Sequence, residues 1–153
     1  MKKIASFTVD HDKLKKGMYV SRVDGDAITY DIRMKVPNGG DYLGCGELHT
    51  FEHLFATFAR NSKYSDSVIY VGPMGCRTGF YLIMRDEVSK KDTIQLVLDA
   101  FDYISTFEGE IPGNKREECG NYLDHDLFGA RAVASDMKNV LSSWSEDKLV
   151  YEK

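Results

Sequence analysis

The sequence lacks a long hydrophobic run, a cysteine framework and a cluster of basic residues. No apolar stretch approaches the ~20 residues of a membrane-spanning helix, and the basic start, residues 1–6, has no apolar segment typical of a signal peptide. The three cysteines, Cys45, Cys76 and Cys119, are an odd number without a CxxC spacing. We therefore expect no membrane span, no disulfide framework and a location in the reducing cytoplasm.

Charge and composition narrow the class further. The net charge is −4 and the basic residues are scattered, whereas binding to nucleic acid needs clustered Lys and Arg. With 153 residues, of which 42% are hydrophobic and 12% aromatic, the chain suits one domain, 1–153, with a real core. Such a domain buries about 70% of the surface that its unfolded chain exposes.

Alternating apolar and polar residues, and short runs of branched and aromatic residues, indicate three strands. They span residues 26–36, 67–71 and 77–84, and the last two are arranged like a hairpin. Apolar residues at helical spacing predict three helices. They span residues 47–60, about 90–106 and about 127–144, with a loop at 108–118. Strands and helices mix without a regular βαβ alternation, so we expect an α+β fold, an antiparallel sheet packed against helices.

The segment His49-Thr50-Phe51-Glu52-His53 predicts a divalent-metal site on the central helix. Residues four apart project from the same face of a helix, and Glu52 joins that face. Two neutral imidazoles suit Zn²⁺ or Fe²⁺, and a carboxylate beside them can move protons. The alternative is a polar helix face without a metal. It is disfavoured because only four histidines exist and because the rest of the helix is apolar, through Leu48, Phe51, Leu54, Phe55 and Phe58.

Two histidines do not complete a metal site. The order HxxEH is that of the inverted-motif metallopeptidases, which take a downstream glutamate as third ligand. In this chain Cys119 lies in a polar loop ahead of the last helix, where a thiolate is a good ligand for a borderline ion. The alternative for Cys119, a small half-buried hydrophobic residue, stays open on this basis.

A second thiol, Cys76, lies in the glycine-rich turn Gly72–Gly79 beside Arg77. Glycines allow close approach of a ligand, and a neighbouring cation favours the thiolate. An inert thiol in a packed turn is the alternative. Cys45 has no evident role beyond packing or a turn.

Further motifs accompany these residues in a fixed order along the chain. They are Ser6-Phe7, Val9-Asp10-His11, Asp31-Ile32-Arg33, the HTFEH segment, Pro73-Met74-Gly75-Cys76-Arg77-Thr78-Gly79-Phe80-Tyr81, Cys119-Gly120, His125-Asp126-Leu127 and Gly129-Ala130. Together they resemble the S-ribosylhomocysteine lyases, the LuxS family of autoinducer-2 synthesis. The combination of HTxEH, PMGCRTG and CG is far more specific than HxxEH alone.

The resemblance implies a homodimer with two active sites at its interface. It implies one divalent ion per subunit, typically Fe²⁺, with Zn²⁺ or Co²⁺ as substitutes. The implied metal ligands are His49, His53 and Cys119, and the implied proton-transfer residues are Glu52 and Cys76. The implied substrate-binding residues are Ser6, His11 and Arg33, with Ser6 and His11 reaching in from the partner chain. One departure is Tyr70, where many family members carry an acidic residue that helps to hold the homocysteine amino end.

The implied reaction cleaves the thioether of S-ribosylhomocysteine to homocysteine and 4,5-dihydroxy-2,3-pentanedione, the autoinducer-2 precursor. A thiolate leaves readily only next to a carbanion, so the carbonyl must migrate from C1 to C3 before elimination across C4 and C5. That migration needs a Lewis acid and positioned bases. Arg33 is expected to order the loop of Cys76 or to favour its thiolate, unless it is a surface arginine that pairs with Asp31 or Asp41. His125 matches a family position, or only caps or buttresses the last helix.

Two other functions remain as alternatives: an HxxEH-type metallopeptidase and a metal-stabilised binding module without catalysis. The first predicts a glutamate as third ligand, and the second predicts no activity to lose when Cys76 is replaced.

Overall fold

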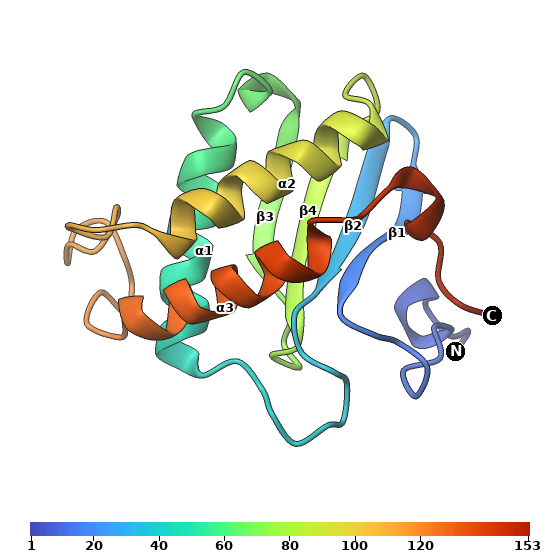
Figure 1. Ribbon diagram of the computed structural model, residues 1–153, viewed down its shortest axis with the longest axis horizontal. Helices are drawn as coiled ribbons and strands as arrows, with labels where there is room; N and C mark the ends of the chain where they lie inside the picture. The colour runs from blue at the N-terminus through green and yellow to red at the C-terminus, as the bar shows by residue number, and fades with distance from the viewer.

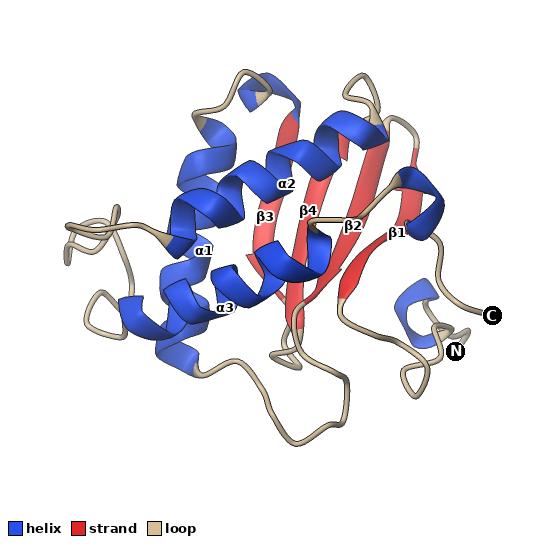
Figure 2. Cartoon of the chain, in the orientation of Figure 1, coloured by secondary structure: helices blue, strands red, loops and turns tan.

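Four antiparallel strands form one sheet in the order β1-β2-β4-β3 (Figures 1 and 2). The computed structural model describes residues 1–153. The strands are β1 (Gly17–Asp24), β2 (Ala27–Arg33), β3 (Val68–Pro73) and β4 (Gly79–Arg85). β1 and β2 form one hairpin, β3 and β4 another, and the β2–β4 pairing joins the two.

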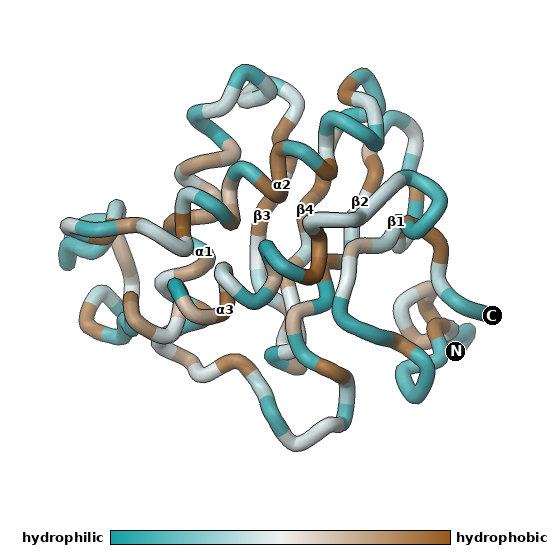
Figure 3. Tube along the Cα trace, viewed as in Figure 1, coloured by the Kyte–Doolittle hydropathy of each residue, from teal (hydrophilic) through white to brown (hydrophobic).

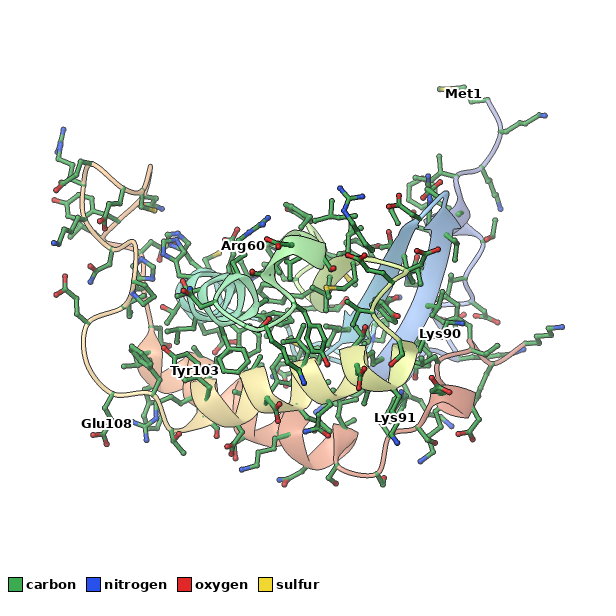
Figure 4. The ribbon with its side chains drawn as sticks, turned by 90° about the horizontal axis from the view of Figure 1, so that it is seen from above. Met1, Arg60, Lys90, Lys91, Tyr103 and Glu108 are labelled. Carbon is green, nitrogen blue, oxygen red and sulfur yellow. The ribbon has the colours of Figure 1, made fainter.

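Three helices pack against this sheet: α1 (Cys45–Arg60), α2 (Lys90–Ser105) and α3 (Leu127–Leu141). Figure 1 shows α2 and α3 crossing one face, with α1 alongside β3. In the view from above, α1 is seen nearly end-on and α2 and α3 lie on the same side of the sheet (Figure 4). Short 3-10 helices occur at Ala5–Phe7, Ser65–Ser67 and Glu146–Lys148. None of the helices combines the length and the hydropathy that a bilayer crossing requires.

An aromatic cluster fixes α1 against the sheet and α2. Phe51 of α1 lies 5.1 Å from Phe80 of β4 and 5.2 Å from Phe101 of α2, measured between ring centroids, and Phe55 lies 5.3 Å from Phe101. Aromatic pairs of this kind contribute about 0.5–1.5 kcal/mol each beyond the burial of their surface. In Figure 3 the strands behind α2 carry hydrophobic stretches, whereas most surface loops are hydrophilic. The apolar face of α1 is therefore held firmly, and its remaining face is free to carry polar groups.

The α+β fold and its antiparallel sheet are confirmed, and so is the hairpin of the two later strands. Several expected boundaries shift by one to three residues; the strand expected over 26–36 ends at Arg33, and the helix expected from 47 begins at Cys45. The strand expected from residue 77 begins at Gly79, because residues 74–77 form the turn, with the Arg77 N–H donating to the Met74 carbonyl at 2.9 Å. The last helix ends at Leu141: the Trp144 backbone N–H donates to the Leu141 carbonyl at 3.0 Å in a turn, and the Trp144 indole N–H donates to the Met18 carbonyl at 2.9 Å.

One strand, β1, was not expected from the sequence. Its burial runs from fully buried at Gly17–Tyr19 to exposed at Arg22–Asp24, so it has no continuous alternation of apolar and polar residues. The strand forms because its backbone pairs with β2 over nearly its whole length, with an irregularity between Val20 and Arg22. Tertiary pairing of this kind overrides weak local preference.

Candidate active site

The two histidines of α1 are oriented by backbone carbonyls of the loop that joins α2 to α3. Nδ1 of His49 lies 2.8 Å from the Asp124 carbonyl oxygen, and Nδ1 of His53 lies 2.7 Å from that of Pro112. A carbonyl only accepts, so each Nδ1 must carry the proton and donate it. Each Nε2 is then left with a free lone pair, the form in which imidazole binds a metal.

Both free nitrogens face the same sulfur. Sγ of Cys119 lies 3.3 Å from Nε2 of His49 and 3.9 Å from Nε2 of His53. A tetrahedral ion with metal–nitrogen and metal–sulfur distances of about 2.0–2.1 and 2.3 Å separates sulfur from nitrogen by about 3.5 Å. The two imidazole rings are nearly perpendicular, at 89°, with centroids 4.6 Å apart, so their lone pairs can converge. The donor set and its spacing fit a divalent ion.

A glycine makes the approach of the loop to His53 possible. Gly113 has φ +73°, and a β-carbon there would lie 3.0 Å from Nδ1 of His53. Only glycine adopts this conformation readily, and only the absence of a side chain lets the Pro112 carbonyl reach the ring. The sequence alone marks Gly113 only as a loop residue. A glycine is required there because of His53, on a helix sixty residues earlier in the chain.

A third imidazole, from His125, joins the cluster. His49, His53 and His125 each offer a ring nitrogen, and these nitrogens lie within 4.8 Å of one another. His125 stacks on His49 with an interplanar angle of 15° and a centroid distance of 4.2 Å. Lone pairs of two stacked rings run side by side instead of converging, so the geometry favours Cys119 over His125 as the partner of the other two imidazoles.

Hydrogen bonds hold His125 in place. Its Nδ1 lies 2.9 Å from Oγ1 of the buried Thr50, which also accepts the Asp126 N–H at 2.9 Å, and its Nε2 is buried without a partner in the chain. Burial lowers the pKa of His125, and the neighbouring His49 and His53 lower it further. His125 therefore tends to stay neutral beside the other two imidazoles; the sequence marked it only as a match to a family position or a buttress of the last helix.

The second thiol, Cys76, lies in the turn between β3 and β4. Its sulfur lies 3.0 Å from Oγ1 of Thr78 and 3.9 Å from Nη1 of Arg33. The same Nη1 donates to Oγ1 of Thr78 at 2.7 Å, which leaves the Thr78 hydroxyl hydrogen free to point at the sulfur. A cation and a hydroxyl donor thus both face the sulfur of Cys76.

Arg33 is not on the surface. It is 3% exposed, and it binds the 2%-exposed Asp31 through two hydrogen bonds of 2.7 and 3.1 Å. The expected alternatives therefore both hold in part, because Arg33 pairs with Asp31 and at the same time points at Cys76. Asp41 pairs instead with Lys35.

Two surface hollows meet at this turn. One, of about 360 Å³, is lined by His49, Asp124 and Cys45 together with residues 73–75 and 77. The other, of about 390 Å³, is lined by His11 and by residues 75–78, Cys76 among them. Gly75 and Arg77 belong to both. A molecule that spans the turn would therefore touch the histidine cluster at one end and Cys76 at the other.

The remaining predicted residues lie in different settings. Glu52 is half-buried on α1, next in sequence to His53. Ser6 lies in the N-terminal 3-10 helix, and neither hollow is lined by it or by Arg33. Tyr70 is 48% exposed and its ring lies over Gly72, where any β-carbon would collide with the phenol. Tyr70 thus covers the strand just before Pro73 and is not aimed into either hollow.

The helix-borne imidazoles and the facing thiol form a cluster whose donors fit a divalent metal ion, and a second thiol lies at the rim of the same region. The family model described as S-Ribosylhomocysteinase (LuxS) matches residues 4–148. The chain is 47% identical over 157 residues to the S-ribosylhomocysteine lyase of Clostridium beijerinckii, with 99% of each chain covered. It is 47% identical to that of Phocaeicola vulgatus, covering 99% and 98% of the two chains, and 46% identical to that of Porphyromonas gingivalis. The chain belongs to the LuxS family.

Proposed function

We propose that this protein is a carbon–sulfur lyase that cleaves the thioether of S-ribosylhomocysteine to homocysteine and 4,5-dihydroxy-2,3-pentanedione. Family membership over nearly the whole chain supports this activity. The observation that carries it structurally is the meeting of the two hollows at Gly75 and Arg77, because it brings the histidine cluster and Cys76 to one substrate. A peptidase would need no second thiol there, and a binding module would need no paired proton carriers.

The proposed metal ligands are His49, His53 and Cys119, and Fe²⁺ is the proposed ion. The support is the fixed Nδ1–H tautomer of both imidazoles and the sulfur–nitrogen spacing. The Asn121 backbone N–H also donates to the Cys119 sulfur at 3.5 Å. When bound, a divalent ion supplies Lewis-acid polarisation of the sugar oxygens.

Cys76 and Glu52 are the proposed proton carriers. Cys76, as thiolate, takes a proton from one sugar carbon and returns it to the next while the carbonyl migrates toward C3. Arg33 contacts the sulfur of Cys76 and lines neither hollow, so we propose that it affects the substrate through Cys76 and not by direct contact. Glu52 then removes the C4 proton; the C4–C5 double bond forms, the C5–sulfur bond breaks, and homocysteine leaves as a thiolate that takes up a proton.

We also propose a homodimer in which Ser6, and the N-terminal segment around it, completes the partner's site. Ile4 and Phe7, on either side of Ser6, are 55% and 68% exposed, so this segment offers neighbouring apolar side chains that a partner chain would cover. His11, which the resemblance assigns to the partner's site, lines the hollow of Cys76 in its own chain, and we propose that it binds substrate there. Because Cys76 and Cys119 must stay free thiols for these roles, a reducing compartment such as the cytoplasm belongs to the same proposal.

The experiment is thiol release from S-ribosylhomocysteine by protein loaded anaerobically with Fe²⁺, followed with a thiol reagent. We expect turnover in the original protein and its loss in Cys76→Ala and Glu52→Gln with the metal content unchanged. Cys119→Ala should lose the metal. A folded, metal-loaded protein that releases no thiol would refute the lyase. Retention of the metal by Cys119→Ala would favour the peptidase reading, with a different third ligand.

A further inference from the structure

A row of polar side chains crosses the sheet on the face away from α2 and α3. Asp31 of β2 is paired in register with Tyr19 of β1 on one side and with Tyr81 of β4 on the other. Side chains that alternate with them, such as Tyr30 and Phe80, are fully buried in the core. Asp31 is nevertheless only 2% exposed. Something must cover it on a face that carries no helix.

The cover is the C-terminal segment. The Leu149 carbonyl accepts the Val20 N–H at 2.7 Å, which extends the edge of the sheet beyond β1. Two residues later the ring of Tyr151 stacks on Tyr19, with centroids 5.0 Å apart and an interplanar angle of 20°. The Tyr151 hydroxyl then donates to Oδ2 of Asp31 at 2.7 Å. In Figure 1 the C-terminus lies beside β1, in agreement with these contacts.

An unbroken set of hydrogen bonds runs from this tail to the thiol of Cys76. Asp31 accepts from Tyr151 and holds the guanidinium of Arg33 through both Nε and Nη2. With two of its nitrogens tied to one carboxylate, the planar guanidinium has a single orientation. That orientation directs Nη1 at Thr78 and Cys76.

We propose that Tyr151 is a positioning residue, which fixes Asp31 and through it Arg33, so that Arg33 stabilises the thiolate of Cys76. The inference rests on the proposed role of Cys76 as a proton carrier. Burial and the charge of Asp31 raise the pKa of Tyr151, so the phenol keeps its proton and remains a donor at any physiological pH. The tail thereby belongs to the active site although it lies on the far side of Arg33 from the substrate.

Loss of the Tyr151 hydroxyl should make the thiolate of Cys76 less stable, not more. The phenol hydrogen places partial positive charge beside the carboxylate of Asp31. Without it, the negative charge of Asp31 is less well neutralised and its side chain is less firmly held. Both effects weaken the positive potential that Arg33 exerts at the sulfur. Arg33 should therefore stabilise the thiolate of Cys76 less in Tyr151→Phe, and the thiol should react more slowly with an electrophile.

Other charges around the thiol stay the same in that variant. The titratable and charged side chains around Cys76 are Arg33, Arg77, His11, Tyr42 and Tyr81, with the Lys35–Asp41 ion pair in the adjoining loop. None of them contacts the Tyr151 hydroxyl, so a change in Cys76 reports the Asp31–Arg33 route.

The experiment is the rate of alkylation of Cys76 by iodoacetamide as a function of pH, in the metal-loaded full chain. Trypsin releases residues 64–77, a peptide with Cys76 as its one cysteine, so mass spectrometry separates it from Cys45 and Cys119. We expect the reaction of Tyr151→Phe to be about threefold slower near neutral pH, because less of the thiol is then present as thiolate. At high pH, where the thiol is fully ionised, the two rates should converge.

Tyr19→Phe is the matched control. It removes a hydroxyl from the other ring of the same stack, but that hydroxyl donates to the Lys15 carbonyl at 3.0 Å and not to Asp31. Its alkylation profile should match that of the original protein. An unchanged profile in Tyr151→Phe, or an equal shift in both variants, would overturn the proposal.

Thiol release measured in parallel separates this inference from the proposed function. A shifted alkylation profile in a protein without lyase activity would support the route to Cys76 and reject the lyase. Normal lyase activity with an unshifted alkylation profile would support the lyase and reject the route from Tyr151 to Cys76. If both hold, Tyr151→Phe should lower kcat at neutral pH more than it raises KM, and the loss should shrink as pH increases.

Discussion

Replacement of Gly113 by alanine should weaken metal binding without touching a ligand. The added β-carbon would lie 3.0 Å from Nδ1 and 3.3 Å from Cε1 of His53, closer than ordinary contact. The loop must move away, and the hydrogen bond from His53 to the Pro112 carbonyl lengthens or breaks. Loss of such an outer contact typically costs 10–100-fold in metal affinity. We expect an effect of that size, about 1.4–2.8 kcal/mol.

Alanine at φ +73° also strains the backbone, by about 1–2 kcal/mol. Gly109→Ala isolates this cost, because Gly109 in the same loop has φ +109° and open space around its β-carbon position. The assay is competition for Zn²⁺ against a chromophoric chelator, at fixed pH and protein concentration. We expect Gly109→Ala to lose stability but keep the affinity of the original protein. Equal affinity in both variants would refute the reasoning that the Pro112 carbonyl orients His53.

Three further predictions concern other parts of the site. Arg33→Met should destabilise the fold by about 3–5 kcal/mol, because it leaves Asp31 buried without its cation. Adding Asp31→Asn to that variant should restore part of the lost stability. Urea unfolding measures both variants, and additive effects of the two substitutions would contradict the pairing. The pKa of His125 is lower in the folded protein than in the unfolded chain, so as pH falls the unfolded chain takes up a proton at this residue before the folded protein does. The contribution of His125 to the stability of the metal-free protein should be complete above pH ~6.5 and should be lost as pH falls toward the folded pKa. In thermal melts across that range, His125→Gln should show a shallower loss of stability. Cys45 lines the hollow of His49 but makes no hydrogen bond to the histidines, and serine has nearly the same size. Cys45→Ser should therefore leave thiol release within about twofold of the original; a larger loss would give Cys45 a role in binding substrate.

Much of the fold could be predicted because its main elements carry strong local patterns. The apolar face of α1 and the spacing of His49 and His53 come from a single helix, so the sequence predicts both. The β3–β4 hairpin was equally accessible, because its glycine-rich turn is local. β1 escaped prediction because its pairing partner, and not its own alternation, makes it a strand.

The candidate site was predictable in its parts but not in its connections. The facing of Cys119 and the two imidazoles agrees with the ligand set that the family resemblance implied. The burial of Arg33 and the stacking of His125 on His49 depend on segments far apart in the chain. Tyr151 gave no signal at all, since an aromatic residue near the end of a chain has no pattern that marks it as a partner of Asp31.

The loop between α2 and α3 contains no helix or strand, yet it carries Cys119 and both carbonyls that orient the histidines. Closing such a loop costs chain entropy, which two carbonyl–imidazole contacts offset only in part. A divalent ion held by α1 and Cys119 would tie the middle of the loop to the helix and remove most of its freedom. Limited proteolysis should therefore cut the metal-free chain between residues 106 and 126 first, where Lys115 and Arg116 are exposed to trypsin. Metal supply would in that way set the lifetime of the protein as well as its chemistry.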